Sequence, residues 1–141
     1  MPTRDRISDM HVKKSESALA EAELLFGAGF FDGAISRASV SSIQIMNAAI
    51  ALQGRPDDPI DVGECVKAWA MDGRLPAAIH LFYEVAMMVR RDADETIQYT
   101  TQGSAEKAIE AARQFSEIVR QTVGVGLAPP TPMNPPTFRS I

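Results

Sequence analysis

Glycine and proline residues divide this chain into five segments, and no other feature constrains its fold as strongly. Gly27 and Gly29 end the first segment, Gly54 ends the second, and Gly73 with Pro76 separates the third from the fourth. Glycine is common just after a helix, and proline cannot continue one. Within the segments apolar residues recur every three or four positions, which is the period of an α-helix. No segment alternates as a half-buried strand would, so the pattern predicts an all-α protein.

The predicted helices belong to one domain, because a chain of 141 residues has enough core for one domain but not for two. We predict an antiparallel bundle of about five helices over residues 1–123. The helices are expected at Arg4 or Ser8 to Phe26, Asp32 to Gln53, Asp61 to Gly73, Pro76 to Ile97 and Ser104 to Val123. Residues 124–141 contain five prolines, so we predict a flexible, disordered Gly/Pro-rich tail there.

Two of the predicted helices carry more apolar residues than one face can hold. The apolar residues outside the main stripe are, in the second helix, Ile35, Val40, Ile43, Met46 and Ile50, and in the fourth, Leu81, Val85, Met87 and Met88. A helix that is apolar on all sides needs to be buried on all sides, and a small bundle surrounds one such helix more easily than two. We therefore expect a homodimer through the apolar faces of helices two and four. The alternative is a monomer whose loops cover the excess.

Charge and composition restrict the classes of function. A net charge of −4 argues against a broad nucleic-acid surface, although it leaves room for a local cluster of arginines. No segment is apolar and long enough to span a membrane, and a polar helix stands where a signal peptide would have its apolar core, so we expect a cytoplasmic protein. Cys65 is the only cysteine, which excludes an intramolecular disulfide and a cysteine-based zinc site. We expect no metal and no cofactor.

Arginines near the predicted core are the candidate binding residues. Arg90 falls on the apolar stripe of the fourth helix, and Arg37 lies at the margin of the inner face of the second. A guanidinium in such a place needs either a carboxylate partner, for example Asp94 beside Arg90, or a cleft that receives phosphate. His80 is a candidate general base, but the sequence places no acid or nucleophile beside it. We identify no catalytic set.

Three segments, in this order, resemble the HEPN family of prokaryotic helical-bundle proteins. Gly29–Ala38 (GFFDGAISRA), continuing to Asn47–Leu52 (NAAIAL), resembles the second helix of that family, which begins with a glycine and an aromatic residue and contains an Arg-Ala pair. Arg90–Asp94 (RRDAD) is similar to the arginine-rich segment of the family, and Ser104–Ala108 (SAEKA) to the start of its closing helix. The resemblance covers about residues 17–122.

The resemblance implies a helical bundle that dimerises and serves in toxin–antitoxin, CRISPR or antiviral systems. Some HEPN proteins are metal-independent ribonucleases, while others are partners of minimal nucleotidyltransferases or non-catalytic binding modules. The ribonucleases carry a histidine a few residues after the arginine, whereas Asp92–Tyr99, which follows Arg91 here, contains none.

We therefore predict a dimeric, HEPN-like, non-catalytic interaction or nucleotide/RNA-binding module. The residues expected to line its cleft are Arg37, Arg90, Arg91 and Asp94. A nucleotidyltransferase or another protein is an expected partner, and RNA or a nucleotide is an expected ligand. One alternative is a ribonuclease that uses Arg90 or Arg91 with a non-standard base such as His80. Another is a structural subunit that recruits a partner through its proline-rich tail.

Overall fold

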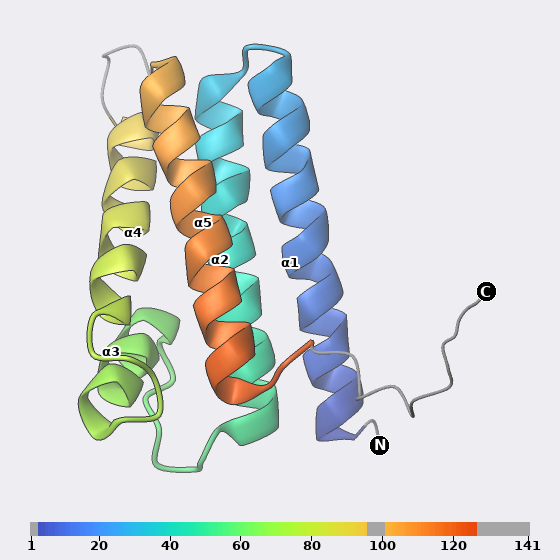
Figure 1. Ribbon diagram of the computed structural model, residues 1–141, viewed down its shortest axis with the longest axis vertical. Helices are drawn as coiled ribbons and strands as arrows, with labels where there is room; N and C mark the ends of the chain where they lie inside the picture. Colours follow the sequence, from blue (N-terminus) through green and yellow to red (C-terminus); the bar gives the residue numbers. More distant parts are fainter. Residues whose placement is uncertain (1–2, 96–100, 127–141) are drawn as a thin grey trace, which may run out of the picture.

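The computed structural model describes residues 3–95 and 101–126, apart from the side chains of Val89 and residues 92–95. Within these ranges it contains five α-helices and no strand, which confirms the all-α prediction. The helices are α1 (Arg4–Gly27), α2 (Phe31–Gln53), α3 (Val62–Asp72), α4 (Ile79–Glu95) and α5 (Gln102–Val123). Figure 1 shows α1 antiparallel to α2 and α4 antiparallel to α5, with the short α3 at the lower end. In the described part of the chain no helix has the length and apolarity that a membrane span requires.

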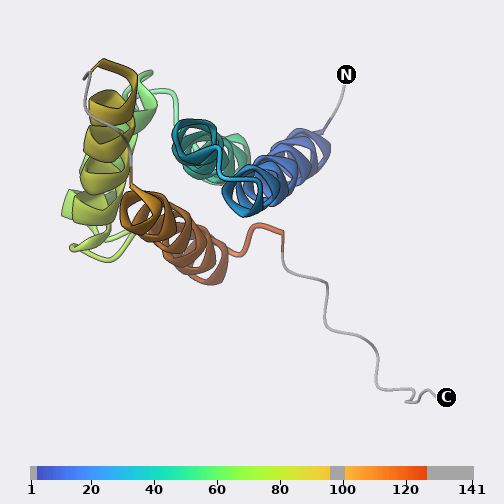
Figure 2. The same ribbon diagram turned by 90° about the horizontal axis from the view of Figure 1, so that it is seen from above.

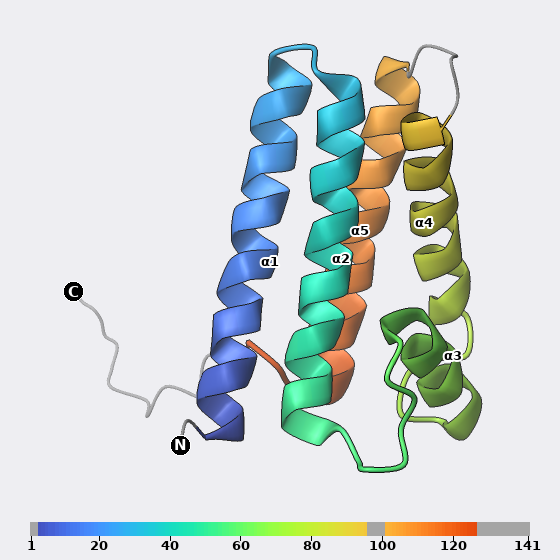
Figure 3. The ribbon, with the colours of Figure 1, turned by 180° about the vertical axis from the view of Figure 1, so that it is seen from behind.

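The second helix is the centre of the bundle. It contacts α1, α3, α4 and α5, and Figures 2 and 3 show it between α1 and the other helices. Its Ile35 and Met46 are fully buried within one chain. Neighbouring helices of the same chain therefore cover these two residues, whereas Val40, Ile43 and Ile50 are half-buried. All four other helices contact α2, and its side that carries Arg37 and Val40 stays open to solvent.

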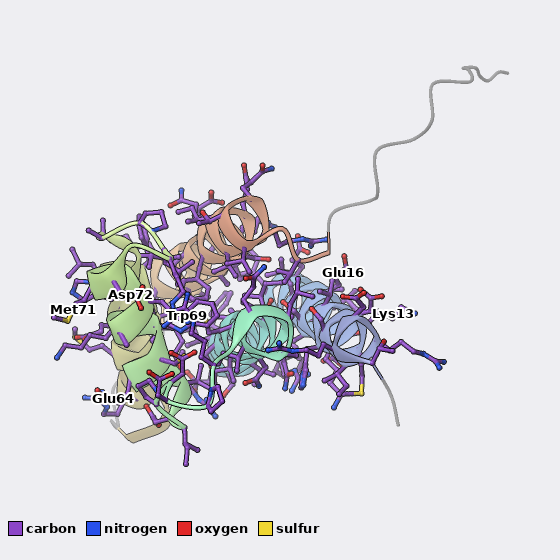
Figure 4. All side chains as sticks on the ribbon, turned by 90° about the horizontal axis from the view of Figure 1, so that it is seen from below. Lys13, Glu16, Glu64, Trp69, Met71 and Asp72 are labelled. Carbon is purple, nitrogen blue, oxygen red and sulfur yellow. The ribbon has the colours of Figure 1, made fainter. Side chains whose placement is uncertain are left out.

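The core changes character along the bundle. At the end that holds α3 it contains large side chains, including Trp69, Phe115 and Ile45. The rings of Tyr83 and Phe115 lie 5.5 Å apart between their centroids, and Figure 4 shows Trp69 on the side of α3 turned toward the other helices. Toward the α1–α2 turn the buried residues are mostly alanines, namely Ala22, Ala34, Ala38, Ala105, Ala108 and Ala112. Alanine has a small side chain that lets helix backbones approach closely, so at this end the core consists mostly of small residues.

A ladder of polar contacts follows the seam between α1 and α2. Its rungs join Arg4 to the carbonyls of Ala51 and Gly54, Ser8 to the carbonyl of Ala48, His11 to Gln44, Ser15 to Ser41, and Glu21 to Arg37. The Arg4 guanidinium lies 2.9 Å from Ala51 O and 2.6 Å from Gly54 O, at the C-terminal end of α2, where cations are favourable. The ladder fixes the register of the two helices.

The ends of the helices follow the predicted signals only in part. The Asp61 carboxylate accepts a hydrogen bond from Glu64 N, so Asp61, where the third helix was predicted to begin, is the N-cap of α3. In contrast, α2 begins at Phe31 without a side-chain cap, so Asp32 lies in its first turn. Thr101, not Ser104, caps α5, because its hydroxyl accepts from Ser104 N. Two residues of α5 therefore precede the predicted start.

The packed chain continues to Gly126, past the predicted domain boundary at residue 123. Val125 is buried, and Arg120 Nη2 donates a hydrogen bond of 2.9 Å to Gly126 O. Gly124, at the end of α5, has a φ of 82°, a left-handed conformation that favours glycine. Residues 127–141 of the predicted tail lie outside the described residues.

Candidate functional site

Arg37 pairs with a carboxylate on the neighbouring helix. Its Nε and Nη2 lie 2.8 Å and 2.6 Å from Oε1 of Glu21 in α1, and both side chains are exposed to solvent. Of the two predicted alternatives, a carboxylate partner or a phosphate-binding cleft, Arg37 has the carboxylate partner, and this partner lies on α1. An exposed ion pair of this kind contributes little stability, about 0–1 kcal/mol. Its main effect is to hold the guanidinium at the surface between α1 and α2.

An open groove of about 790 Å³ lies along this surface. The described residues that line it belong to α1 and α2, and they include the cations Arg6, Lys13, Lys14 and Arg37. Figure 4 shows Lys13 projecting from α1 away from the rest of the bundle. Arg37 is one of the predicted binding residues, whereas the three cations of α1 were not predicted. Their spacing of seven or eight residues, which returns to one side of a helix, is the signal that points to them.

Arg90 and Arg91 lie on α4, away from this groove. The half-buried Arg90 shares a side of α4 with Tyr83, two turns earlier. Burial, with a smaller contribution from the Asp61 carboxylate, raises the pKa of the Tyr83 hydroxyl to about 12, while the Arg90 guanidinium acts in the opposite direction. Arg91 is exposed on another side of the helix. The groove thus brings Arg37 together with residues of α1, and not with Arg90 or Arg91; the side chain of Asp94 lies outside the described residues.

His80 is near the start of α4, and its ring is oriented by the backbone. Its Nδ1 lies 2.9 Å from Ala77 O, a geometry in which the protonated Nδ1 donates to the carbonyl. That arrangement leaves Nε2 as the nitrogen able to accept a proton. Arg90 follows ten residues later, about 15 Å along the helix, so the two side chains do not form a pair within one chain.

The most strongly bonded ionic cluster joins the α2–α3 loop to the end of α3. Arg74 Nη1 and Nη2 donate to the two Asp58 carboxylate oxygens at 3.0 Å and 2.6 Å, and Nη2 also lies 2.7 Å from Asp72. The Arg74 guanidinium carbon is 4.4 Å from the centre of the Trp69 ring. The hydrogen bonds from Arg74 hold the pKa of Asp58 well below its usual range, and the two carboxylates raise the pKa of Arg74. All its members are already bonded to one another, so we assign the cluster a structural role.

An apolar groove of about 460 Å³ lies between α4 and α5. Leu81 and Val85 line it with exposed fractions of 57% and 49%, and Met88 continues their row at 49%. Lys107 and Glu110 of α5 form its charged rim. Three of the four apolar residues predicted outside the main stripe of α4 are therefore exposed, whereas Met87 is half-buried.

Comparison with protein-family models, curated proteins and solved structures finds no match. The HEPN resemblance stays a prediction from the sequence motifs. Among the described residues, no group of three or more His, Cys, Asp or Glu side chains is placed to hold a metal ion.

Proposed function

We propose that this protein is a non-catalytic, HEPN-like interaction module that acts as a dimer through α4. The observation that carries the proposal is the exposed apolar row of Leu81, Val85 and Met88. Large exposed apolar patches on a small protein mark sites where another molecule binds. The resemblance to HEPN proteins adds the expected setting, a toxin–antitoxin or defence system.

The spacing of the row fits a second α-helix. Ala78, Leu81, Val85 and Met88 follow one another at intervals of three, four and three residues, which is the spacing of a two-helix seam. The rim of the groove carries one cation and one anion, Lys107 and Glu110, so it favours neither an acidic nor a basic partner. A second copy of the chain presents the same row and the same rim. A two-fold pairing of α4 with α4 buries the two apolar rows against each other and brings together two rims that each carry one cation and one anion.

The test is the association state of the full chain, measured by sedimentation equilibrium over the micromolar range. We expect a dimer for the wild type and a monomer for Val85→Glu, because the substitution places a carboxylate in the seam. Leu24→Glu is the matched control, since Leu24 is exposed on α1 and should leave the dimer intact. A monomeric wild type, or a Val85→Glu variant that still dimerises, contradicts the proposal.

A second candidate function is the ribonuclease, and one relationship on α4 favours it. Arg91 follows His80 by eleven residues, three helical turns, so the two side chains leave the helix on nearly the same side. They are about 16 Å apart along one helix, too far to act together. An antiparallel two-fold pairing centred near Val85 places His80 of one copy level with Arg91 of the other along the helix axis, with both side chains on the same flank of the seam and not within it. Such a pair combines a proton acceptor with a phosphate-binding cation.

This candidate is tested by RNA cleavage in the presence of a chelator. The wild type should cleave, and His80→Ala and Arg91→Ala should each be inactive. Mixing the two inactive variants should restore activity, since a mixed dimer keeps one intact His80–Arg91 pair. Absence of cleavage by the wild type rejects the ribonuclease and leaves the dimer proposal standing.

A further inference from the structure

The groove between α1 and α2 has a charge opposite to that of the whole chain. Four cations, Arg6, Lys13, Lys14 and Arg37, face two carboxylates, Asp9 and Glu21, so the lining residues sum to +2. The complete chain has a net charge of −4. A local excess of one sign on a protein of the other sign attracts a partner segment of opposite charge.

An apolar strip accompanies these cations. Met10 of α1 is 45% exposed, and the half-buried Val40 of α2 lies in the same groove. The lining of α1 extends from Arg6 to Glu21, about 22 Å along the helix axis. That length corresponds to about four turns of a second helix. Apolar residues bordered by cations are the pattern that accepts a helix with an apolar stripe and acidic flanks.

We propose that the α1–α2 groove binds an acidic amphipathic helix of a partner protein. Apolar residues of the partner cover Met10 and Val40, and its carboxylates pair with Lys13, Lys14 and Arg6. Arg37 is held in place by Glu21 and lies at the far end of the groove. The site uses neither α4 nor α5, so it is independent of the proposed dimer.

Nucleic acid fits this groove less well. Asp9 and Glu21 lie among the cations and repel phosphate groups. Among the described residues that line it there is no aromatic side chain on which a base could stack. Contacts to phosphates alone also leave the exposed Met10 without a role. An acidic helix accounts for the cations and for the apolar strip together.

The experiment is an NMR titration of the ¹⁵N-labelled full chain with three probes. The first is a synthetic peptide of about four helical turns with leucine at helical spacing and glutamate elsewhere. The second has lysine in place of every glutamate, and the third is a single-stranded RNA. We expect the glutamate peptide to shift amide signals of residues 6–21 and 37–44. The double variant with Lys13→Glu and Lys14→Glu should bind the glutamate peptide about tenfold more weakly. Met10→Asp should also weaken binding of the glutamate peptide.

Controls separate the outcomes. Lys67→Glu on α3 is a single charge reversal outside the groove and should not change the affinity for the peptide, and circular dichroism establishes that each variant is folded. Val85→Glu should bind the peptide as the wild type does, which keeps this proposal distinct from the dimer. The proposal is overturned if the glutamate peptide leaves the groove signals unshifted or if the lysine peptide binds equally well. It is also overturned if RNA binds more tightly through the same lysines and Met10→Asp has no effect.

Discussion

Ser15 and Ser41 exchange hydrogen bonds across the α1–α2 seam. Ser15 Oγ donates to Ser41 O at 2.8 Å, and Ser41 Oγ donates to Ser15 O at 2.9 Å. Both side chains are buried, so each hydroxyl satisfies its donor without water. Because serine is small, the two helix backbones approach closely at this point. The pair is the central rung of the ladder that sets the register of α1 on α2.

Substitutions at Ser41 should separate the hydrogen bond from the close approach. We expect Ser41→Ala to lower the free energy of unfolding by about 1 kcal/mol, the net value of one hydrogen bond. Ser41→Leu should cost more, up to ~3 kcal/mol, because the larger side chain forces the helices apart. Urea unfolding measures both, and Ser17→Ala on the exposed side of α1 is the control with no expected change. A leucine variant as stable as the wild type would show that the seam tolerates a wider separation.

The ion pair between Asp58 and Arg74 should be important for stability. The Asp58 side chain is only 8% exposed, and both its oxygens accept from Arg74. Asp58→Asn leaves the guanidinium with one carboxylate, so we expect a loss of about 2 kcal/mol, somewhat less than for a fully buried pair. Asp57→Asn, at an exposed neighbouring position, is the matched control and should change the stability little. Equal losses for the two variants would argue against a specific role of Asp58.

The same pair predicts how stability changes with pH. The pKa of Asp58 is lowered in the folded chain, mainly by the hydrogen bonds from Arg74. As the pH falls below about 4, the unfolded chain binds a proton at this carboxyl before the folded chain does. The stabilisation is therefore complete above pH 4 and decreases toward the lower folded pKa. The difference in unfolding free energy between wild type and Asp58→Asn should shrink from pH 5 to pH 2, and a constant difference would contradict the assignment.

The helical frame could be predicted because it depends on local signals. Gly73, for example, has a φ of 90°, a left-handed conformation that favours glycine and ends a helix, so this signal lies in a single residue. Partners across the bundle could not be predicted in this way. The sequence does not show that Ile35 and Met46 turn toward other helices of the same chain, because this depends on how α2 is rotated among its neighbours.

In the candidate site, too, contacts between different helices could not be predicted from the sequence. The position of Arg37 at the margin of an inner face was readable from helical spacing, but its partner Glu21 comes from another helix. The cations of α1 by themselves are typical of a solvated helix face, and they form a groove only because α2 packs beside them. The hydrogen bonds between Asp58 and Arg74 also join residues on either side of a helix, so sequence spacing does not predict this pair.

Cys65 should react with a thiol reagent only after the protein opens. Its side chain is fully buried, and this burial raises the pKa of the thiol to about 11. Reaction requires the exposed thiolate, so DTNB should modify the native chain far more slowly than the chain unfolded in guanidinium. The measurement is unambiguous because the chain has one cysteine. Modification at the same rate in both states would contradict the burial.

The end of the packed domain can be located by comparing two shortened chains. A chain that ends at Val123 lacks the buried Val125, the glycine at the end of α5 and the carbonyl that accepts from Arg120. Relative to a chain that ends at Gly126, we expect a loss of about 2 kcal/mol, because burial of a valine side chain alone contributes about that much.

Gly126→Ala tests the same contact without shortening the chain. Its φ is 65°, and an added Cβ would lie 3.0 Å from Arg120 Nη2 and 3.0 Å from Val12 Cγ1. We expect a loss of about 1 kcal/mol or more from the left-handed backbone alone. Gly27→Ala is the control, since a Cβ there meets no atom within 4 Å and its φ is not positive. If the chain ending at Val123 and the Gly126→Ala variant both unfold at the wild-type urea concentration, the segment 124–126 does not hold α5 to α1.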